Sequence, residues 1–179
     1  SRGLGDVYKR QPFLLTNAIL PLLREAPAAR ILTVSSGSHR NTEIHWRDVM
    51  LRRGYNTLRA YKQSKLANLL FTYEFNRRYA GDSAMRAYAI NPGLVNTEIG
   101  LKGTRGIVRW VWDKRRADGR TPEQGAATVV YLATSPDVEI TQGVYWKDCK
   151  PIAPSDYAQQ EEEAARLWAL SARLCGLQA

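Results

Sequence analysis

The sequence predicts an α/β protein built around a parallel β-sheet. Two observations carry this prediction: short apolar runs typical of buried strands alternate with longer segments of helical periodicity, and small polar residues follow the strands. Strands that are separated by helices favour parallel βαβ units with right-handed crossovers. At 179 residues, 44% of them hydrophobic and 24% charged, the chain is long enough for one domain with a full core.

Predicted helices and strands alternate along the whole chain. Apolar residues at helical spacing mark the helices, and short apolar runs rich in β-branched or aromatic residues mark the strands. Thr121, Pro122 and Glu123 predict a helix start, because they supply an N-cap, a proline at the first helical position and an acidic residue in the first turn. The predicted elements are helices over 12–26, 58–80, 121–133 and 155–174 and strands over 30–35, 85–90 and 143–146.

The composition limits where the protein works. No apolar run approaches the roughly 18 residues of a membrane-spanning helix, and the first ten residues contain no apolar core of a secretory signal. The two cysteines, Cys149 and Cys175, form no CxxC pair, and we interpret Cys149 as a structural thiol. We therefore predict a cytoplasmic protein without a membrane span.

The net charge of +9 raises the question of a nucleic-acid partner. Basic residues cluster over 101–120, with Trp110 and Trp112 between them, and arginine beside aromatic residues can bind phosphates and stack on bases. No helix-turn-helix, zinc-finger or RNA-binding signature accompanies the cluster. We interpret it as an exposed, arginine-rich segment of a globular domain and predict no nucleic-acid partner.

The sequence predicts no metal centre. His39 and His45 flank Glu43, but no third or fourth ligand follows at a suitable spacing. We interpret both histidines as loop residues.

One pair of residues has the spacing of an acid–base group. Tyr61 is the one tyrosine of nine with a lysine, Lys65, four positions later. On a helix, such positions share a face, with Cβ atoms about 5–6 Å apart. A positive charge there favours the ionised phenol, which would help it exchange a proton near neutral pH. The same spacing also fits a polar stripe on an ordinary surface helix, so the surroundings of the pair decide between the two interpretations.

Other polar groups are predicted at the same edge of the sheet. Ser35 and Ser36 end the first strand, Tyr61 and Lys65 begin the following helix, and Asn91 follows the next strand. Ligands of open parallel sheets bind outside the carboxyl ends of the strands. We therefore expect these groups to converge on one ligand.

These motifs resemble one protein family. The segments VSSGSH, AYKQSKLANLLFT and NPGLVNTEI are similar to the short-chain dehydrogenase/reductase family, and within it to the retinol-dehydrogenase-like branch. The segments TPEQGAATVVYLA, GVYWKDCKP and EEEAARLWALSARLCGL are similar to the end of that branch, so the resemblance covers roughly residues 13–177. It implies a Rossmann-like, doubly wound parallel sheet, present here as the C-terminal half of one domain.

The resemblance also implies roles for individual residues. Tyr61 would be the acid or base at the substrate oxygen, and Ser36 would stabilise that oxygen. Lys65 would tune the tyrosine and hold the ribose hydroxyls of a nicotinamide nucleotide. The implied reaction is hydride transfer between NAD or NADP and an alcohol or carbonyl substrate. The residues implied to contact the cofactor are Tyr61, Lys65, Pro92, Gly93, Val95 and Thr97.

The front of the chain departs from the family. Members begin with a strand and a glycine-rich turn, whereas SRGLG here follows no strand and, with Pro12 close behind, leaves no room for the helix that a dinucleotide motif requires. The family's catalytic asparagine would align near Tyr8. We therefore predict that residues 1–11 are a foreign or miscalled leader and that residues 12–179 are the C-terminal part of a longer enzyme.

Three questions stay open from the sequence. Residues 98–120 occupy the place of a substrate lid in the family, where Trp110 and Trp112 either line an apolar substrate or anchor the lid. Besides an oxidoreductase, a non-catalytic remnant or interaction module of the same fold and a basic nucleic-acid-binding domain remain alternatives. By the resemblance, a wide apolar arc on the helix over 58–80 implies a homodimer of the complete enzyme. The arc consists of Leu69, Leu70, Phe71, Tyr73 and Phe75.

Overall fold

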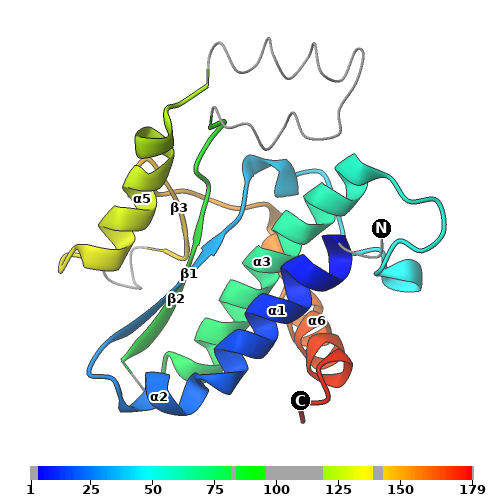
Figure 1. The fold of residues 1–179 in the computed structure, drawn as a ribbon, viewed down its shortest axis with the longest axis horizontal. Helices are drawn as coiled ribbons and strands as arrows, with labels where there is room; N and C mark the ends of the chain where they lie inside the picture. The colour runs from blue at the N-terminus through cyan, green and yellow to red at the C-terminus, as the bar shows by residue number, and fades with distance from the viewer. Residues whose placement is uncertain (1–3, 82–83, 96–118, 139–142, 179) are drawn as a thin grey trace.

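A computed structural model of the chain shows a mixed α/β fold around a four-stranded sheet (Figure 1). It describes residues 4–81, 84–95, 119–138 and 143–178. The predicted α/β class is confirmed, because the strand order is β1-β2-β3-β4 and the first three strands run parallel. The strands are β1 (Ala29–Val34), β2 (Met85–Ile90), β3 (Tyr145–Lys147) and the antiparallel β4 (Lys150–Pro151).

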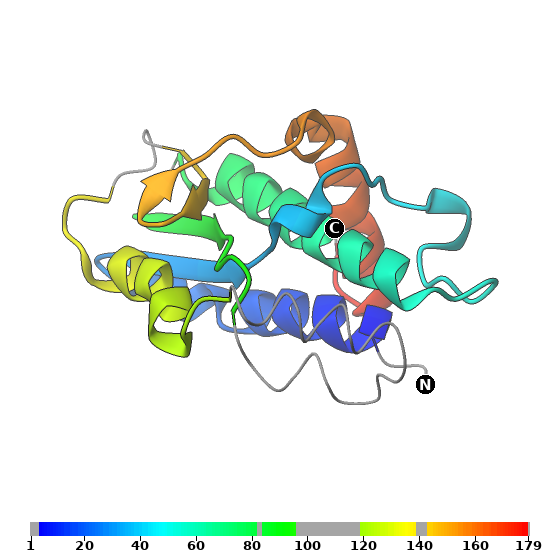
Figure 2. The ribbon, with the colours of Figure 1, turned by 90° about the horizontal axis from the view of Figure 1, so that it is seen from above.

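Helices cover both faces of the sheet. One face carries α5, and the other carries α3, which is flanked by α1 and α6 (Figures 1 and 2). The helices are α1 (Leu4–Ala18), α2 (Leu20–Glu25), α3 (Thr57–Tyr79), α5 (Pro122–Thr134) and α6 (Glu161–Leu174), with 3₁₀ turns η1 (Gly37–His39), η2 (Trp46–Asp48) and η5 (Asp156–Gln159). The predicted start of α5 is confirmed: Thr121 is its N-cap, and Gln124 completes a capping box.

The core consists of packed layers on the two faces of β2. On the α3 side, Leu66, Leu69 and Leu70 are fully buried. On the α5 side, Leu132 and Trp146 are buried in a separate cluster. Burial of this kind stabilises a fold by about 1.5–3 kcal/mol for each large apolar side chain. The core therefore holds α3 and β2 in the relative positions on which the site depends.

The first helix begins earlier than the sequence predicts. α1 runs from Leu4 through Pro12 to Ala18, so the expectation that no helix precedes Pro12 is wrong. Tertiary packing outweighs the local cost of the proline: the ring of Phe13 lies 4.9 Å from that of Trp168 in α6, edge to face. That residues 1–11 are a leader stays a prediction.

The apolar arc on α3 is covered within the chain. Leu69, Leu70 and Phe75 are fully buried, and Phe71 stacks on Trp168 with ring centres 5.6 Å apart. The arc therefore packs against the sheet, α1 and α6, and it no longer argues for a partner subunit. The homodimer stays a prediction without this support.

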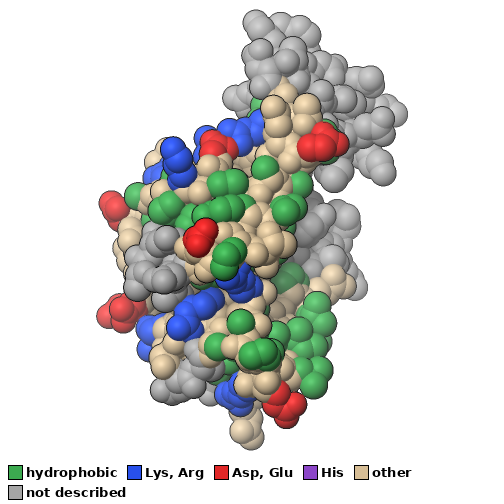
Figure 3. Space-filling model, turned by 90° about the vertical axis from the view of Figure 1, so that its left-hand side faces the viewer, with side chains coloured by type: hydrophobic (Ala, Val, Ile, Leu, Met, Phe, Trp, Pro, Cys, Tyr) green, Lys and Arg blue, Asp and Glu red, His purple; other side chains and the backbone are tan. Residues whose placement is uncertain are grey.

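The face of the molecule that carries α5 mixes all kinds of side chain. Basic, acidic and apolar groups lie interspersed there, and the described part of this face shows no continuous basic patch (Figure 3). Most of the basic cluster over 101–120, with Trp110 and Trp112, lies outside the described residues.

One half-buried side chain, that of Asn76, joins α3 to the central strand. The Asn76 amide donates to the carbonyl of Ala87 at 2.8 Å, and its Oδ1 accepts from the Ala87 N–H at 2.8 Å. Asn76 thus satisfies both backbone groups of one β2 residue, as a neighbouring strand would.

We expect Asn76→Ala to lower the free energy of unfolding by about 2–4 kcal/mol, because it leaves a buried N–H and a buried C=O without partners. Urea denaturation of the purified chain measures this loss. Arg59→Ala, an exposed change on the same helix, is the control and should lie within about 0.5 kcal/mol of the unsubstituted chain. Equal unfolding free energies for the two variants would contradict the expectation.

Candidate functional site

The predicted polar groups follow the carboxyl ends of two paired strands. β1 ends at Val34 and β2 ends at Ile90, and these two residues are partners in the parallel register. The Ser35 N–H donates to the Ile90 carbonyl at 2.7 Å, which extends the ladder by one bond. The turns that follow both strands therefore leave the sheet at the same edge.

Helix α3 brings Tyr61 and Lys65 to this edge. The Asn56 side chain caps the helix by accepting from the Arg59 N–H at 3.0 Å, so Tyr61 lies in the first turns. Tyr61 is 43% exposed. The Lys65 ammonium lies 5.6 Å from the centre of the Tyr61 ring. The two side chains thus share a face, as their spacing predicts.

The Val34 carbonyl holds the Lys65 side chain in place. Lys65 Nζ donates to this oxygen at 3.1 Å, and Asn68 Nδ2 donates to it at 2.9 Å. The Ser35 hydroxyl donates to the Lys65 carbonyl at 2.8 Å and fastens the helix backbone to the same strand end. Burial lowers the pKa of the Lys65 ammonium. Asn68 was not predicted from the sequence, although its position three residues after Lys65 places it on the same helix face.

Ser36 sits where the chain turns away from β1. It is the N-cap of η1, where its Oγ accepts from the Ser38 N–H at 3.2 Å and contacts the Ser38 hydroxyl at 3.3 Å. Both contacts are long, so the hydroxyl can turn toward another acceptor at low cost.

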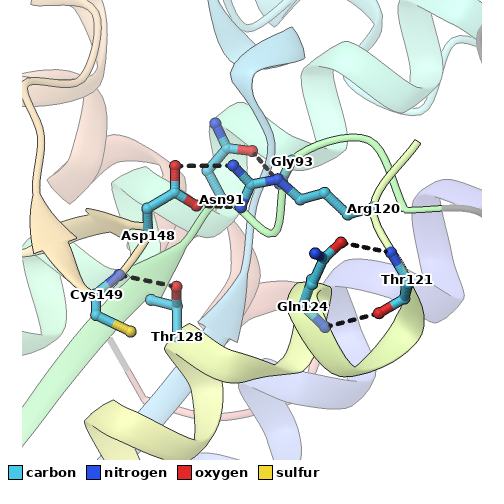
Figure 4. Close-up of polar contacts among 8 residues, drawn as sticks. All are labelled: Asn91, Gly93, Arg120, Thr121, Gln124, Thr128, Asp148 and Cys149. Atoms are coloured by element: carbon cyan, nitrogen blue, oxygen red, sulfur yellow. Dashed lines mark hydrogen bonds and ion pairs between the residues drawn. The ribbon is translucent and has the colours of Figure 1, made fainter. Parts of the chain in front are cut away.

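The turn after β2 is shaped by the Asn91 side chain. Its Oδ1 accepts from the Gly93 N–H at 3.1 Å (Figure 4). Gly93 has a φ of +77°, and a Cβ there would lie 2.9 Å from Nε of Arg120. A side chain at position 93 would therefore be strained and would collide with the guanidinium. Pro92 and Gly93 are both half-buried.

Arg120 connects the turn to the β3–β4 hairpin. Its guanidinium forms a bidentate ion pair with Asp148, with Nη2 donating to Oδ2 at 2.8 Å (Figure 4). Its backbone bridges to Val95, and Gly125 of α5 leaves room for the Val95 side chain. Thr97, the remaining residue predicted to contact a cofactor, lies outside the described residues.

The hairpin that carries Asp148 was not predicted from the sequence. Asp148 and Cys149 have φ values of +54° and +56°, the two left-handed residues of a tight hairpin turn. The Cys149 N–H donates to the Thr128 hydroxyl at 3.1 Å (Figure 4). The backbone of Cys149 thus forms part of the turn. The turn could not be recognised from the sequence, because it lacks the Asn-Gly pair that usually marks a tight hairpin.

His39 lies in the short η1 turn between β1 and α3, and its side chain is fully buried. Its side chain has no solvent exposure, its Nδ1 lies 2.7 Å from the Ser36 carbonyl, and its Nε2 accepts from the Ser155 N–H at 3.0 Å. Burial is the main cause that lowers the pKa of His39, Arg40 adds to it, and the bond to Ser36 opposes it. Among the described residues, no three His, Cys, Asp or Glu side chains gather as metal ligands would.

Comparison with known proteins confirms the predicted resemblance. Retinol dehydrogenase 11 from Homo sapiens is 38% identical over 165 residues, which are 92% of this chain and 51% of that protein. Retinol dehydrogenase 13 from Homo sapiens is 39% identical over a match of 178 residues, gaps included, that covers 93% of this chain and 52% of that protein. The chain is a relative of the short-chain dehydrogenases/reductases. It spans about half the length of the curated relatives it matches, and no family model matches it.

A solved structure supports the same conclusion for the fold. The crystal structure of an uncharacterized protein from Mycobacterium paratuberculosis matches with a TM-score of 0.68 and 34% sequence identity. The match covers 93% of this chain and 56% of that chain. The α/β arrangement of this short-chain dehydrogenase/reductase relative therefore recurs in a larger protein.

The predicted cytoplasmic location is wrong by this comparison. Retinol dehydrogenases 11 to 14, which the chain resembles, are membrane-associated proteins. Within the described ranges, no helix is long and apolar enough to cross a bilayer. These residues match only about half of such a relative, so their apolar content could not decide where the protein is located.

We expect the chain to lose stability as the pH falls below about 6.5, the usual pKa of an unfolded histidine. The unfolded chain then binds a proton that the buried, neutral His39 does not bind until a lower pH, so protonation favours unfolding. Urea unfolding at pH 7.5 and pH 5.5 measures the change. His39→Asn should weaken this pH dependence and His45→Asn should keep it; the same slope in all three proteins would contradict the assignment.

Proposed function

We propose that this chain carries the nicotinamide-facing, catalytic part of an NAD(P)-dependent oxidoreductase that interconverts an alcohol and a carbonyl compound. The observation that carries the proposal is the placement of the Lys65 ammonium, held by the Val34 carbonyl and 5.6 Å from the Tyr61 ring, where two parallel strands end. A polar stripe on an ordinary surface helix does not require a half-buried lysine tied to the end of a strand. The relatives' name supports an oxidoreductase.

The described residues fit the nicotinamide and ribose end of such a cofactor. An ammonium has three N–H donors, and Lys65 uses one of them on Val34, which leaves donors for ribose hydroxyls. Gly93 presents backbone without a side chain beside the edge of the sheet, and the family resemblance adds its neighbours Pro92 and Val95. Thr97 joins this set through the family resemblance.

The bound nicotinamide would supply or accept the hydride. Tyr61 would donate its phenolic proton to the carbonyl oxygen during reduction and would take the proton back during oxidation. Ser36 would donate a hydrogen bond to the same oxygen and stabilise its developing negative charge. The Lys65 ammonium would favour the phenolate at the moment of transfer.

The relatives also suggest the class of substrate. Retinol dehydrogenases are named for a long apolar alcohol, so we propose an apolar alcohol or its aldehyde as the substrate. We further propose that residues 12–179 are the C-terminal part of a longer enzyme, because the chain spans about half of these relatives.

We expect the 179-residue chain to bind NADPH and NADH weakly, because the pyrophosphate turn and adenosine pocket of the family have no counterpart in its motifs. Isothermal titration calorimetry with each nucleotide measures this affinity. The full-length enzyme is the control and should bind at least one of them in the micromolar range or tighter. A micromolar dissociation constant for the 179-residue chain would show that it holds the whole cofactor site.

In the full-length enzyme, we expect Tyr61→Phe to reduce kcat by about 10²–10⁴-fold, the usual loss when general acid–base catalysis is removed. The ring stays, so cofactor affinity should survive. Tyr55→Phe is the matched control, because Tyr55 is a similarly exposed tyrosine without a lysine four positions later. Near-normal turnover by Tyr61→Phe would rule out its role as the acid–base residue.

Lys65→Ala should change two properties of the full-length enzyme together. Cofactor affinity should fall through the lost ribose contacts, and the pH optimum should move upward because the charge that favours the phenolate is gone. Lys62→Ala, on the same helix, is the control and should change neither property. An unchanged affinity and pH profile in Lys65→Ala would contradict the proposed role; Lys65→Arg is not a neutral replacement, because a planar guanidinium replaces a compact ammonium.

A further inference from the structure

A buried polar cluster lies beneath both turns of the candidate site. It consists of His39 from η1, Tyr145 from β3 and Asn91 at the end of β2, and both His39 and Tyr145 are buried from solvent. The proposed reaction uses none of these three side chains. Buried polar groups are normally held by specific partners, so their partners indicate what they do.

The two partners of His39 determine its tautomer. The Ser36 carbonyl can only accept a hydrogen bond, so Nδ1, which lies 2.7 Å from this oxygen, must carry the ring proton. The Ser155 N–H can only donate, so Nε2, at 3.0 Å, must be unprotonated. His39 is therefore a neutral bridge from the backbone of Ser36 to a chain segment 116 residues away.

Tyr145 and Asn91 extend this bridge to the second turn. The His39 and Tyr145 rings meet edge to face with centres 5.3 Å apart. The Tyr145 hydroxyl lies near the Asn91 side chain but makes no hydrogen bond of normal geometry within the described residues. Asn91 holds the Gly93 N–H, and its amide nitrogen would lie 3.4 Å from a Cβ at Gly37, the residue after Ser36.

We propose that His39 is a positioning residue, which sets the orientation of Ser36 through the bond from Nδ1–H to the Ser36 carbonyl. The inference rests on the proposed oxidoreductase function, in which Ser36 donates to the substrate oxygen. Ser36 is extended, with φ −167° and ψ 155°, and its Oγ has only long contacts with Ser38. The Ser36 carbonyl also accepts from the His39 backbone N–H, at 3.2 Å, so the 2.7 Å bond from the imidazole is the shortest interaction that holds this residue. Its loss would loosen Ser36 and let the hydroxyl move away from the reacting oxygen.

Two substitutions separate the bonds of the imidazole. In His39→Asn the side-chain amide nitrogen occupies the place of Nδ1 and keeps the donor to Ser36, while the acceptor for Ser155 is lost. In His39→Gln the side-chain oxygen reaches the place of Nε2 and keeps the acceptor for Ser155, while the donor to Ser36 is lost. Each variant loses one buried hydrogen bond, so a purely structural role would affect both to a similar degree.

The test compares kcat and KM of these variants in the full-length enzyme, with an apolar aldehyde as substrate and NADPH or NADH as cofactor. We expect His39→Gln to reduce kcat by about ten- to a hundredfold with little change in KM, because a displaced catalytic group weakens the transition state more than substrate binding. His39→Asn should stay within about threefold of the unsubstituted enzyme, although both variants unfold at lower temperature. Tyr145→Phe keeps the ring against His39 and is the control, with kcat unchanged.

Equal kcat values for His39→Asn and His39→Gln would overturn the inference and leave the oxidoreductase function standing. An inactive unsubstituted enzyme would overturn the proposed function, and the inference with it. Histidine nitrogen NMR of the unsubstituted enzyme decides the geometry even where a variant does not fold. We expect a neutral ring with the proton on Nδ1, and a ring protonated on Nε2 alone would overturn the proposed bond to Ser36.

Discussion

The parallel pairing of β1 with β2 is the constraint on which the candidate site depends. All six residues of β1 have partners in β2, from Ala29 opposite Met85 to Val34 opposite Ile90, so both strands end at the same level. The turns after them would otherwise be free to diverge, because a loop has few backbone hydrogen bonds of its own. The shared register brings the Ser36 turn and the Gly93 turn to one edge of the sheet, and α3 adds Tyr61 and Lys65 there.

The carbonyl group of Val34 joins the sheet to the polar side chains of α3. β1 is the outermost strand of the described sheet, and the Val34 oxygen at its carboxyl end accepts from both Lys65 and Asn68. The opposite side of α3 is anchored by apolar burial of Leu66 and Leu70. Apolar packing fixes the helix without fixing its rotation closely, whereas hydrogen bonds depend on direction. The two together keep Lys65 half-buried while Tyr61 remains open to a ligand.

Polar side chains inside the fold also hold backbone groups in place. Asn76 completes the bonding of β2 far from the site, and His39 links the Ser36 carbonyl to the Ser155 N–H beneath it. A buried polar group without a partner lowers the free energy of unfolding, so the hydrogen bonds that these two side chains make stabilise the fold. Arg120 serves the second turn in a related way, because its ion pair with Asp148 holds it against Gly93. These polar groups thus hold the two turns and the strands on which the candidate site depends.

By itself, the sequence determined the α/β class, the exact bounds of β2, the helix start at Thr121 and the placement of Tyr61 and Lys65 on one helix face. These features follow from local periodicity, capping chemistry and the general rule for parallel sheets, all of which act between near neighbours or through the backbone. Only the tertiary structure decided that α1 continues through Pro12 and that the apolar arc of α3 is covered by α1 and α6. It also decided the tautomer of His39, which depends on Ser155, 116 residues away. Contacts between such distant residues depend on how layers pack, and one sequence read along its length carries no periodic signal for them.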